Sequence, residues 1–297
     1  MRLLRWLPRS RVGRIGLALA AVYLAWGSSY LALHVALESF PPLLLSGLRN
    51  LFAGIGLFVF AARRASAWPT FVEVRNAGIV GTMLVGLSSG LLTFGMKSVS
   101  TGAAAVIIAT VPLFATIIAA IAGRPVARGE WAAIALGLAG IVVLNHGNAS
   151  SAPASGSIVI LMAALAWAGG AHLASRLALP ADLFMSTALQ IGLGGAISTA
   201  VAWLDGERVV QAGFSAIAAF VYLMLIATML AYVAYGFLIR HTSPIVASSC
   251  MYVNPIVAVA LGALMLGEPV TRWTVMATLA ILLSVALSFW FDRRRAS

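Results

Sequence analysis

Residues 101–122 read TGAAAVIIATVPLFATIIAAIA, a run of 22 residues that contains no charged side chain and carries Pro112 near its centre. At about 1.5 Å per residue, an α-helix of this length crosses the ~30 Å hydrocarbon core of a bilayer. The rest of the chain is similar, since 62% of its 297 residues are hydrophobic and 9% are charged. Soluble domains carry about 25% charged residues. We therefore predict an all-α integral membrane protein.

Ten windows of the sequence are long and apolar enough to cross the membrane, and short connections with Gly, Pro or charged residues separate them. They cover residues 15–37, 43–62, 77–96, 101–122, 130–146, 156–175, 183–204, 215–238, 245–267 and 273–291. The first window follows several arginines, as in a signal peptide, but it exceeds the ~7–15 apolar residues of such a peptide. We expect it to be a retained span, and the connections are too short for a nucleotide-binding domain.

Lysine and arginine residues are distributed unevenly between the two ends of the predicted spans. Along the alternating connections, 15 lie on one side and 3 on the other, while Arg49 falls inside a span. Basic residues near span ends favour the cytoplasmic side. The sequence thus predicts a multi-pass protein of a bacterial inner (plasma) membrane with both termini in the cytoplasm. Because the net charge of +11 is spread over span ends, it does not predict a nucleic-acid partner.

The second half of the sequence repeats landmarks of the first half at offsets of 141 to 144 residues. The matched landmarks are Trp26 and Trp167, Pro112 and Pro255, and GRPV at 123–126 and GEPV at 267–270. Each copy, 15–146 and 156–291, contains five predicted spans. Because five is odd, the two copies must cross the membrane in opposite directions. Inverted repeats of this kind are frequent in secondary transporters, whose binding sites lie near mid-bilayer between the repeats.

The prolines Pro112 and Pro255 are counterparts that lie near the centres of their spans. Proline removes a backbone donor and clashes with the preceding turn, which bends a helix. Two helices bent around a central cavity would present nearby polar groups, namely Thr110 and Asn254, to that cavity. The alternative is that both kinks serve helix packing alone.

Hydroxyl groups in the third and eighth spans are further candidates for a cavity wall. Ser89 and Thr93 lie in the third span, and Tyr232 and Tyr235 lie in the matching region of the eighth. These side chains would line a solvated path. The hydroxyls of the third span could equally bond the backbone of their own helix.

Two tryptophans, Trp26 and Trp167, lie in the middle of their spans, away from the interfacial belt where tryptophan is usually found. As counterparts in the two repeats, they would form the walls of a pocket for a flat or apolar substrate. Packing in the protein core is the alternative.

Arg49 is the basic residue that falls inside a predicted span. A charge at that depth costs about 3 kcal/mol on insertion scales and normally faces the interior of the helix bundle. All eight acidic residues map to span ends or connections, and Glu38 is the nearest candidate partner. Arg49 is therefore either a structural residue, bound to the backbone or to Glu38, or a ligand for an anionic group of the substrate.

Few titratable groups are available for coupling transport to protons. Proton-coupled carriers commonly use a buried carboxylate, whereas the spans here offer only His34 and His172, which could also be packing residues. We expect coupling to be weak or absent. The sequence contains no motif typical of an enzyme, a phosphate-binding loop or a metal site, and its single Cys250 cannot form an intrachain disulfide. It predicts neither an enzyme nor a cofactor.

Several of these stretches together resemble the EamA-type family of the drug/metabolite transporter superfamily. They are AWGSSY at 25–30, PPLLLSGLR at 41–49, TVPL at 110–113, GLAG at 137–140 and YVNP at 252–255. The similarity extends over roughly 15–291 and is strongest to the bacterial drug/metabolite exporters of that family. One departure is Asn50, which stands where relatives commonly have phenylalanine.

This resemblance implies ten helices in an inverted repeat, a cavity lined chiefly by spans 1, 3, 4, 6, 8 and 9, and a peripheral pair formed by spans five and ten. It also implies export of amino acids, metabolites or toxic compounds. The candidate cavity residues are Trp26, Ser29, Ser89, Thr93, Thr110, Pro112, Trp167, Tyr232, Tyr235, Tyr252, Asn254 and Pro255, with Arg49 as the intramembrane charge.

We therefore expect a secondary exporter or facilitator of small metabolites, amino acids or drugs that works by alternating access. The alternative is a structural or interaction protein of the membrane, which predicts a fully packed interior. A small-molecule substrate and the lipid bilayer are the expected partners. The sequence leaves open the substrate, the transport direction, the coupling ion and the choice between monomer and homodimer.

Overall fold

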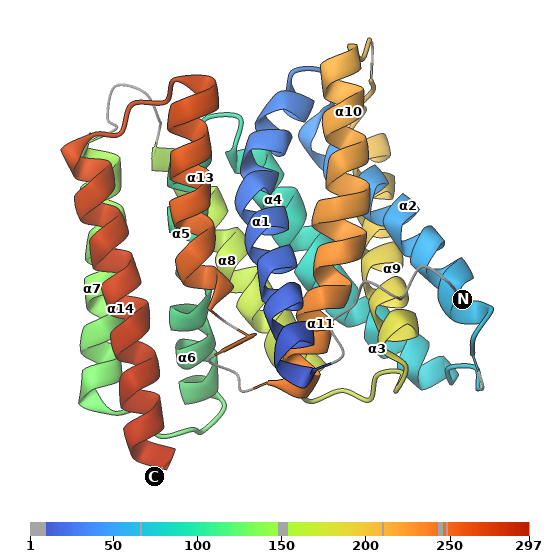
Figure 1. Cartoon of the computed structure of the whole chain (residues 1–297), viewed down its shortest axis with the longest axis horizontal. Helices are drawn as coiled ribbons and strands as arrows, with labels where there is room; N and C mark the ends of the chain where they lie inside the picture. The colour runs from blue at the N-terminus through green and yellow to red at the C-terminus, as the bar shows by residue number, and fades with distance from the viewer. Residues whose placement is uncertain are drawn as a thin grey trace.

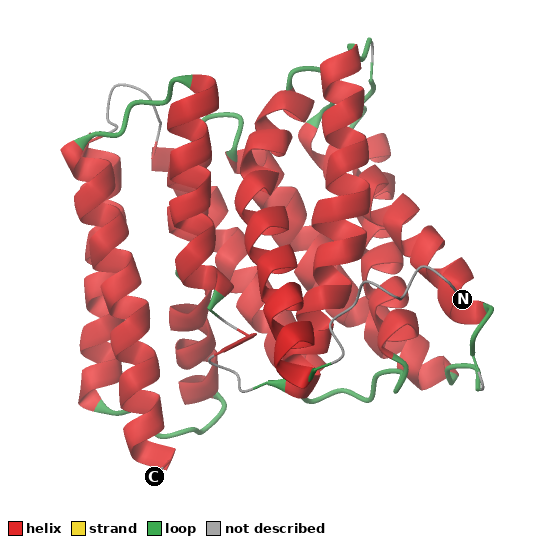
Figure 2. Cartoon of the chain, viewed as in Figure 1, coloured by secondary structure: helices red, strands yellow, loops and turns green. Residues whose placement is uncertain are grey.

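The computed structural model of the chain describes residues 10–65, 67–147, 154–209, 211–242, 246–247 and 249–296, and over these residues it is a bundle of helices without strands (Figure 2). The first half contains α1 (Arg11–Leu37), α2 (Pro42–Ala62), α3 (Phe71–Gly81), η1 (Thr82–Leu87), α4 (Ser88–Gly95), α5 (Thr101–Ile108), α6 (Val111–Ile121) and α7 (Arg128–Gly147). The second half contains α8 (Ala154–Ala174), α9 (Leu183–Leu204), α10 (Phe214–Tyr222), η2 (Leu223–Leu230), α11 (Ala231–His241), α13 (Cys250–Leu266) and α14 (Arg272–Ala296).

The ten predicted spans are all present as helical stretches, with ends that differ by a few residues. Among the described residues, eight continuous helical stretches are long and apolar enough to cross a membrane, and two shorter apolar stretches, Cys250–Leu266 and Arg272–Ser288, correspond to the last two spans. Large apolar side chains such as Leu264 and Phe214 are more than 80% exposed on the outside of the bundle. Such a surface is stable against lipid and not against water. The predicted all-α integral membrane fold is therefore confirmed.

The two halves run in opposite directions through the bundle. In Figure 1, α7 leads away from the end where α14 finishes, although α7 and α14 are counterparts. The start of α1 and the end of α14 lie at this same end (Figure 1), which we call the arginine-rich end. Its described arginines include Arg11, Arg14, Arg63, Arg64, Arg75, Arg124, Arg128, Arg176 and Arg240. Two copies of a five-span repeat account for this geometry. Because the number of spans in each copy is odd, the second copy enters the membrane from the side opposite to the first.

Glycines let counterpart helices pack closely in two places. A Cβ atom added at Gly54 of α2 would lie 2.3 Å from Cα of Gly192 in α9, and one added at Gly195 would lie 2.4 Å from the backbone nitrogen of Leu51. Helices in lipid associate through such close contacts, since lipid is as apolar as the side chains. The helices α7 and α14 form the second pair at the periphery (Figure 1), as the resemblance implies.

The third and eighth spans each contain a π-helical segment at matching positions. They are η1 (Thr82–Leu87), which joins α3 to α4, and η2 (Leu223–Leu230), which joins α10 to α11. A π-helical turn widens the helix by one residue and is often found at functional sites. The segment η2 lies beside α1 and α2, and α4, which continues from η1, lies beside α2 and α8. Residue periodicity did not predict them.

The two proline-bearing spans differ. The fourth span is interrupted at Ala109 and Thr110, and Pro112 lies in the first turn of α6, where its missing N–H group is not needed. Its counterpart α13 instead continues through Pro255 from Cys250 to Leu266. Residues 245 and 248 of this predicted window lie outside the described residues. Pro255 therefore lies inside a continuous helix, whereas Pro112 follows a break.

Two carboxylates connect the halves at the end opposite the arginine-rich end. Glu207, which follows α9, accepts a 2.7 Å hydrogen bond from the backbone N–H of Leu44 at the start of α2. Glu268, which follows α13, accepts hydrogen bonds from the backbone N–H groups of Thr101 (2.8 Å) and Gly102 (3.2 Å) at the start of α5. The first N–H groups of a helix lack partners within it and carry partial positive charge. We call these contacts the two carboxylate clamps.

Candidate substrate cavity

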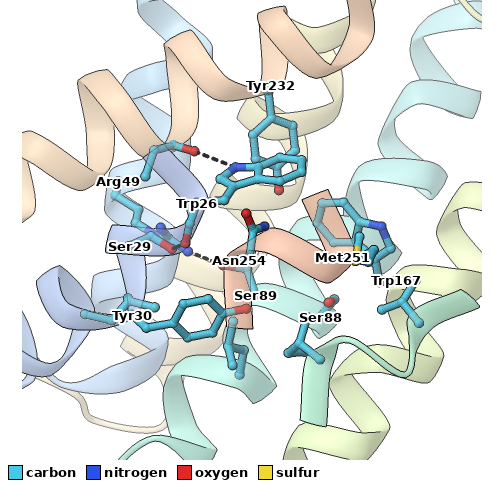
Figure 3. Close-up of a pocket in the computed structure, with 15 residues that line it drawn as sticks. Trp26, Ser29, Tyr30, Arg49, Ser88, Ser89, Trp167, Tyr232, Met251 and Asn254 are labelled. Carbon is cyan, nitrogen blue, oxygen red and sulfur yellow. Dashed lines mark hydrogen bonds between the residues drawn. The ribbon is translucent and has the colours of Figure 1, made fainter. Parts of the chain in front are cut away.

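A central cavity lies between the two repeats and encloses about 680 Å³ of space between atoms, counting its open side. The lining residues are Trp26, Ser29, Tyr30 and Leu33 of α1, Arg49 of α2, Ser88, Ser89 and Leu92 of α4, Ile108 of α5, Val111 of α6, Trp167 of α8, Ala227 of η2, Tyr232 of α11, and Met251 and Asn254 of α13 (Figure 3). The interior of the described bundle is therefore not fully packed.

Trp26 is the centre of an aromatic cluster on one side of this cavity. Its ring centroid lies 5.8 Å from that of Trp167, 5.7 Å from that of Tyr232 and 5.0 Å from that of Tyr235. The indole Nε1 donates a 3.0 Å hydrogen bond to the carbonyl oxygen of Ala227 in η2 (Figure 3). Because this bond joins α1 to the π-helical segment of the other repeat, it fixes the plane of the Trp26 ring. The cluster provides a rigid, flat and apolar wall.

Arg49 brings a buried positive charge to the cavity. Its side chain is 8% exposed, and its Nη2 donates a 2.6 Å hydrogen bond to Oγ of Ser89 (Figure 3). The hydroxyl of Ser46 also donates to Oγ of Ser89, over 2.9 Å. The ion pair formed among the described residues joins Arg124 and Glu130, so the contact between Arg49 and Glu38 that the sequence suggested is absent there. The guanidinium is held by a neutral hydroxyl.

Two buried polar atoms of the cavity wall have no hydrogen-bond partner among the described residues. They are Nε of Arg49 and Oδ1 of Asn254, which come from different repeats. Buried polar groups are nearly always paired, and an unpaired one is costly. In Figure 3 both side chains are grouped around the same space as Trp26 and Tyr232. The cavity therefore offers one free donor and one free acceptor beside an aromatic wall.

Seven of the predicted site residues line the central cavity together. They are Trp26, Ser29, Arg49, Ser89, Trp167, Tyr232 and Asn254. Six others lie elsewhere. Pro112 and Tyr235 line neighbouring cavities, and Tyr252 packs beside the apolar cluster around Leu113.

The remaining predicted residues are buried in the helices. The hydroxyl of Thr93 donates to the carbonyl oxygen of Ser89 at 2.7 Å, and that of Thr110 donates to the carbonyl oxygen of Ile107 at 2.7 Å. Thr93 follows the alternative in which a hydroxyl group of the third span binds its own helix, while Thr110 binds the backbone of the turn that precedes it. Pro255 is buried within α13.

Eight of the residues that line the central cavity were not predicted, although the sequence contains a signal for two of them. Tyr30 and Leu33 lie four and seven positions after Trp26, on the same face of α1. Helical periodicity applied outward from Trp26 would have identified both. The apolar residues Ile108, Val111 and Met251 give no such signal, because the sequence contains many equivalent residues in its spans.

Two further cavities lie between the aromatic cluster and the arginine-rich end. One, of about 830 Å³, contains Pro112 and Arg124 in its wall, and the other, of about 1,460 Å³, contains Pro180 and Arg240. Trp167 lines all three cavities. The aromatic cluster therefore separates the central cavity from the space at the arginine-rich end.

Comparison with known proteins identifies the family. Residues 14–146 and 154–290 each match the EamA-like transporter family. The chain is 37% identical over 275 residues to the uncharacterized inner membrane transporter YedA of Escherichia coli (strain K12), covering 91% of this chain and 89% of that protein.

More distant relatives agree with this match. A protein of Salmonella typhimurium named "Probable amino-acid metabolite efflux pump" is 26% identical over 304 residues, with coverage of 93% of this chain and 95% of the relative. A solved crystal structure has the same fold, with a TM-score of 0.67, 18% identity, and coverage of 97% of this chain and all of the other. The duplicated match and the close relative together show that the chain belongs to the EamA-like transporter family.

Proposed function

We propose that the chain is a secondary transporter that exports small organic solutes, such as metabolites, amino acids or drugs, across the bacterial inner membrane. The observation that carries this proposal is the central cavity, whose unpaired donor and acceptor come from opposite repeats, Arg49 and Asn254. A site shared between two inverted repeats changes its access when the repeats rock against each other. The units that rock would be residues 15–146 and 156–291.

The orientation of this transporter follows from its basic residues. We infer that the arginine-rich end faces the cytoplasm, with both termini there, because 15 basic residues lie at that side and 3 at the other. Green fluorescent protein fused to either terminus should then fluoresce, since it folds in the cytoplasm. A dark fusion at one end only, with normal expression, would contradict the inverted repeat.

The conformation supports a cytoplasm-facing state. The two larger cavities lie at the arginine-rich end, while the carboxylate clamps of Glu207 and Glu268 connect the repeats at the other end. We infer that solute enters from the cytoplasm past the aromatic cluster. No carboxylate lines the described central cavity, which supports a facilitator that is driven by the solute gradient.

Flux into proteoliposomes tests the proposal directly. A panel of radiolabelled amino acids, aromatic acids and cationic drugs should include at least one solute that crosses faster than in empty liposomes. Replacement of Trp167, which lines all three cavities, by alanine should abolish this flux, whereas replacement of the lipid-facing Trp131 should not. Absence of flux for the whole panel in folded protein would favour a membrane protein without transport.

A further inference from the structure

The central cavity carries a positive charge that no negative side chain in its described lining balances. Arg49 is the one lining residue with a permanent charge, and none of the described lining residues is a carboxylate. All eight acidic residues of the chain lie at helix ends or in connections. An isolated charge in an apolar interior is strongly unfavourable unless a counterion approaches it. A bound anion would therefore be stabilised here, and a bound cation would be repelled.

The donors around Arg49 fit a carboxylate. The guanidinium uses Nη2 to bind Ser89 and leaves Nε unpaired in the described structure. Oγ of Ser89 accepts hydrogen bonds from both Arg49 and Ser46, so its own proton remains available to a ligand. A carboxylate has two oxygens that accept such charge-assisted hydrogen bonds in one plane.

The acceptor on the opposite repeat requires a donor on the ligand. Oδ1 of Asn254 is unpaired in the described structure, and this side chain is 7% exposed. A hydroxyl or a neutral N–H group on the ligand would pair with it. An ammonium group would pair with it too, but it would add a second positive charge beside Arg49 without any carboxylate to offset it.

The remaining walls favour a flat apolar body. The rings of Trp26, Trp167 and Tyr232 meet edge to face or tilted, with centroids 5.7 to 6.0 Å apart. An aromatic ring of the ligand would continue this cluster, because aromatic pairs prefer such arrangements. The hydrogen bond from Trp26 to Ala227 holds the wall in place before a ligand arrives.

We propose that the central cavity selects monoanionic carboxylates that carry an aromatic ring and one neutral hydrogen-bond donor, and that it discriminates against zwitterionic amino acids of the same shape. Arg49 and Ser89 bind the carboxylate, Asn254 accepts the neutral donor, and Trp26, Trp167 and Tyr232 contact the ring. This inference rests on the proposed transport function, because it names the class of solute for the same site.

Four probes with one phenyl ring test the inference by binding to the purified protein, measured as quenching of tryptophan fluorescence. They are 3-phenyllactate, 3-phenylpropanoate, phenylalanine and phenethylamine. We expect 3-phenyllactate to bind most tightly. Because a hydrogen bond to Asn254 is lost, 3-phenylpropanoate should bind about tenfold more weakly. Phenylalanine should be weaker than 3-phenyllactate by a similar or larger factor, and phenethylamine should not bind measurably.

Two variants separate the contributions of charge and hydrogen bonding. Asn254→Leu has a similar volume and should make 3-phenyllactate and 3-phenylpropanoate bind equally, while both stay preferred over phenylalanine. Arg49→Gln should weaken both carboxylates at least about tenfold, since a charge-assisted hydrogen bond is lost. If Arg49→Gln fails to fold, the Asn254→Leu comparison still decides. The lipid-facing variant Trp131→Ala is the control and should keep the order of the native protein.

Proteoliposome flux with the same probes separates this inference from the proposed function. Faster transport of 3-phenyllactate than of phenylalanine supports both. Equal or faster transport of phenylalanine, or tighter binding of it, overturns the inference while the transporter assignment stands. Ordered binding without flux of any panel member contradicts the proposed function and leaves the selectivity of the cavity intact.

Discussion

Ser89 connects two other polar side chains at the wall of the central cavity. Its Oγ accepts hydrogen bonds from Nη2 of Arg49 at 2.6 Å and from the hydroxyl of Ser46 at 2.9 Å, and all three side chains are buried. A hydroxyl that satisfies two donors contributes more than one hydrogen bond to stability, because its loss leaves both donors unpaired. The position of Arg49 therefore depends on Ser89.

Replacement of Ser89 by alanine is predicted to destabilise the folded protein. The guanidinium of Arg49 and the hydroxyl of Ser46 would both lose their acceptor, at a cost of about 1–3 kcal/mol. The midpoint of thermal unfolding in detergent should fall measurably. Ser88→Ala is the matched control, since Ser88 lines the same cavity and makes no such bridge among the described residues. An equal midpoint for both variants would contradict the structural role of Ser89.

At the scale of single residues, the sequence predicts which side chains are unusual in a span more readily than it predicts which side chains they contact. Trp26, Trp167 and Arg49 were predicted because a tryptophan or a charge at mid-span is unusual, and Asn254 because it is a polar group beside a mid-span proline. The pairing of Arg49 with Ser89 was not predicted, because it depends on how α2 and α4 cross in space. Thr93 and Thr110 were assigned to the cavity, although their hydroxyls bind their own helices. Hydroxyl groups are ambiguous in this way because they have a local partner in every helix.

At the scale of helices, close packing depends on glycine. The counterpart helices α2 and α9 approach until Gly54 and Gly192 are in backbone contact, and a Cβ atom added at Gly195 would lie 2.4 Å from the nitrogen of Leu51. The spans themselves were predictable, because hydrophobic length alone defines them. The segments η1 and η2 were not, because a π-helical turn leaves the composition unchanged.

Gly195→Ala is predicted to separate α2 from α9. The new methyl group would clash with backbone that cannot move aside locally, and overpacking of this kind typically costs about 1–3 kcal/mol. The expected result is a lower midpoint of thermal unfolding. Gly169→Ala in α8 serves as the control, since an added Cβ there meets nothing within 4 Å and alanine favours the helix. An unchanged midpoint for Gly195→Ala would show that the two helices are not closely packed.

Glu268 is predicted to hold the end opposite the arginine-rich end closed. The backbone N–H groups of Thr101 and Gly102 donate to different oxygens of Glu268, so glutamine keeps one of these acceptors and loses the other. It also removes the charge that favours the positive start of α5. Glu268→Gln should therefore increase access to the central cavity from that end. In a Cys250→Ala background, a cysteine at Ser29 should react severalfold faster with an impermeant maleimide applied to that side. An unchanged rate would contradict the role of this clamp.

The whole molecule consists of two repeats that share one cavity. The duplication was predictable because landmark residues recur at a nearly constant offset, and the inversion followed from an odd number of spans. The side of the membrane toward which the cavity opens was not predictable from the sequence. It depends on contacts that are present in one repeat and absent from the other. One such difference is that Glu268 has Arg124 as its counterpart in the first repeat. Arg124 pairs with Glu130 within its own repeat, so the two ends of the molecule are held differently.

Access of one cavity residue from both sides of the membrane distinguishes a carrier with alternating access from a closed membrane protein. A cysteine replaces Ser29, which lines the central cavity, in the Cys250→Ala background, and an impermeant maleimide is applied to right-side-out and to inside-out vesicles. Alternating access predicts labelling in both preparations, while an isosteric cysteine at Ser284, which is buried within the bundle, stays unlabelled in both. Labelling of the Ser29 position from one side only, or from neither, would contradict a carrier that moves solute between the two compartments.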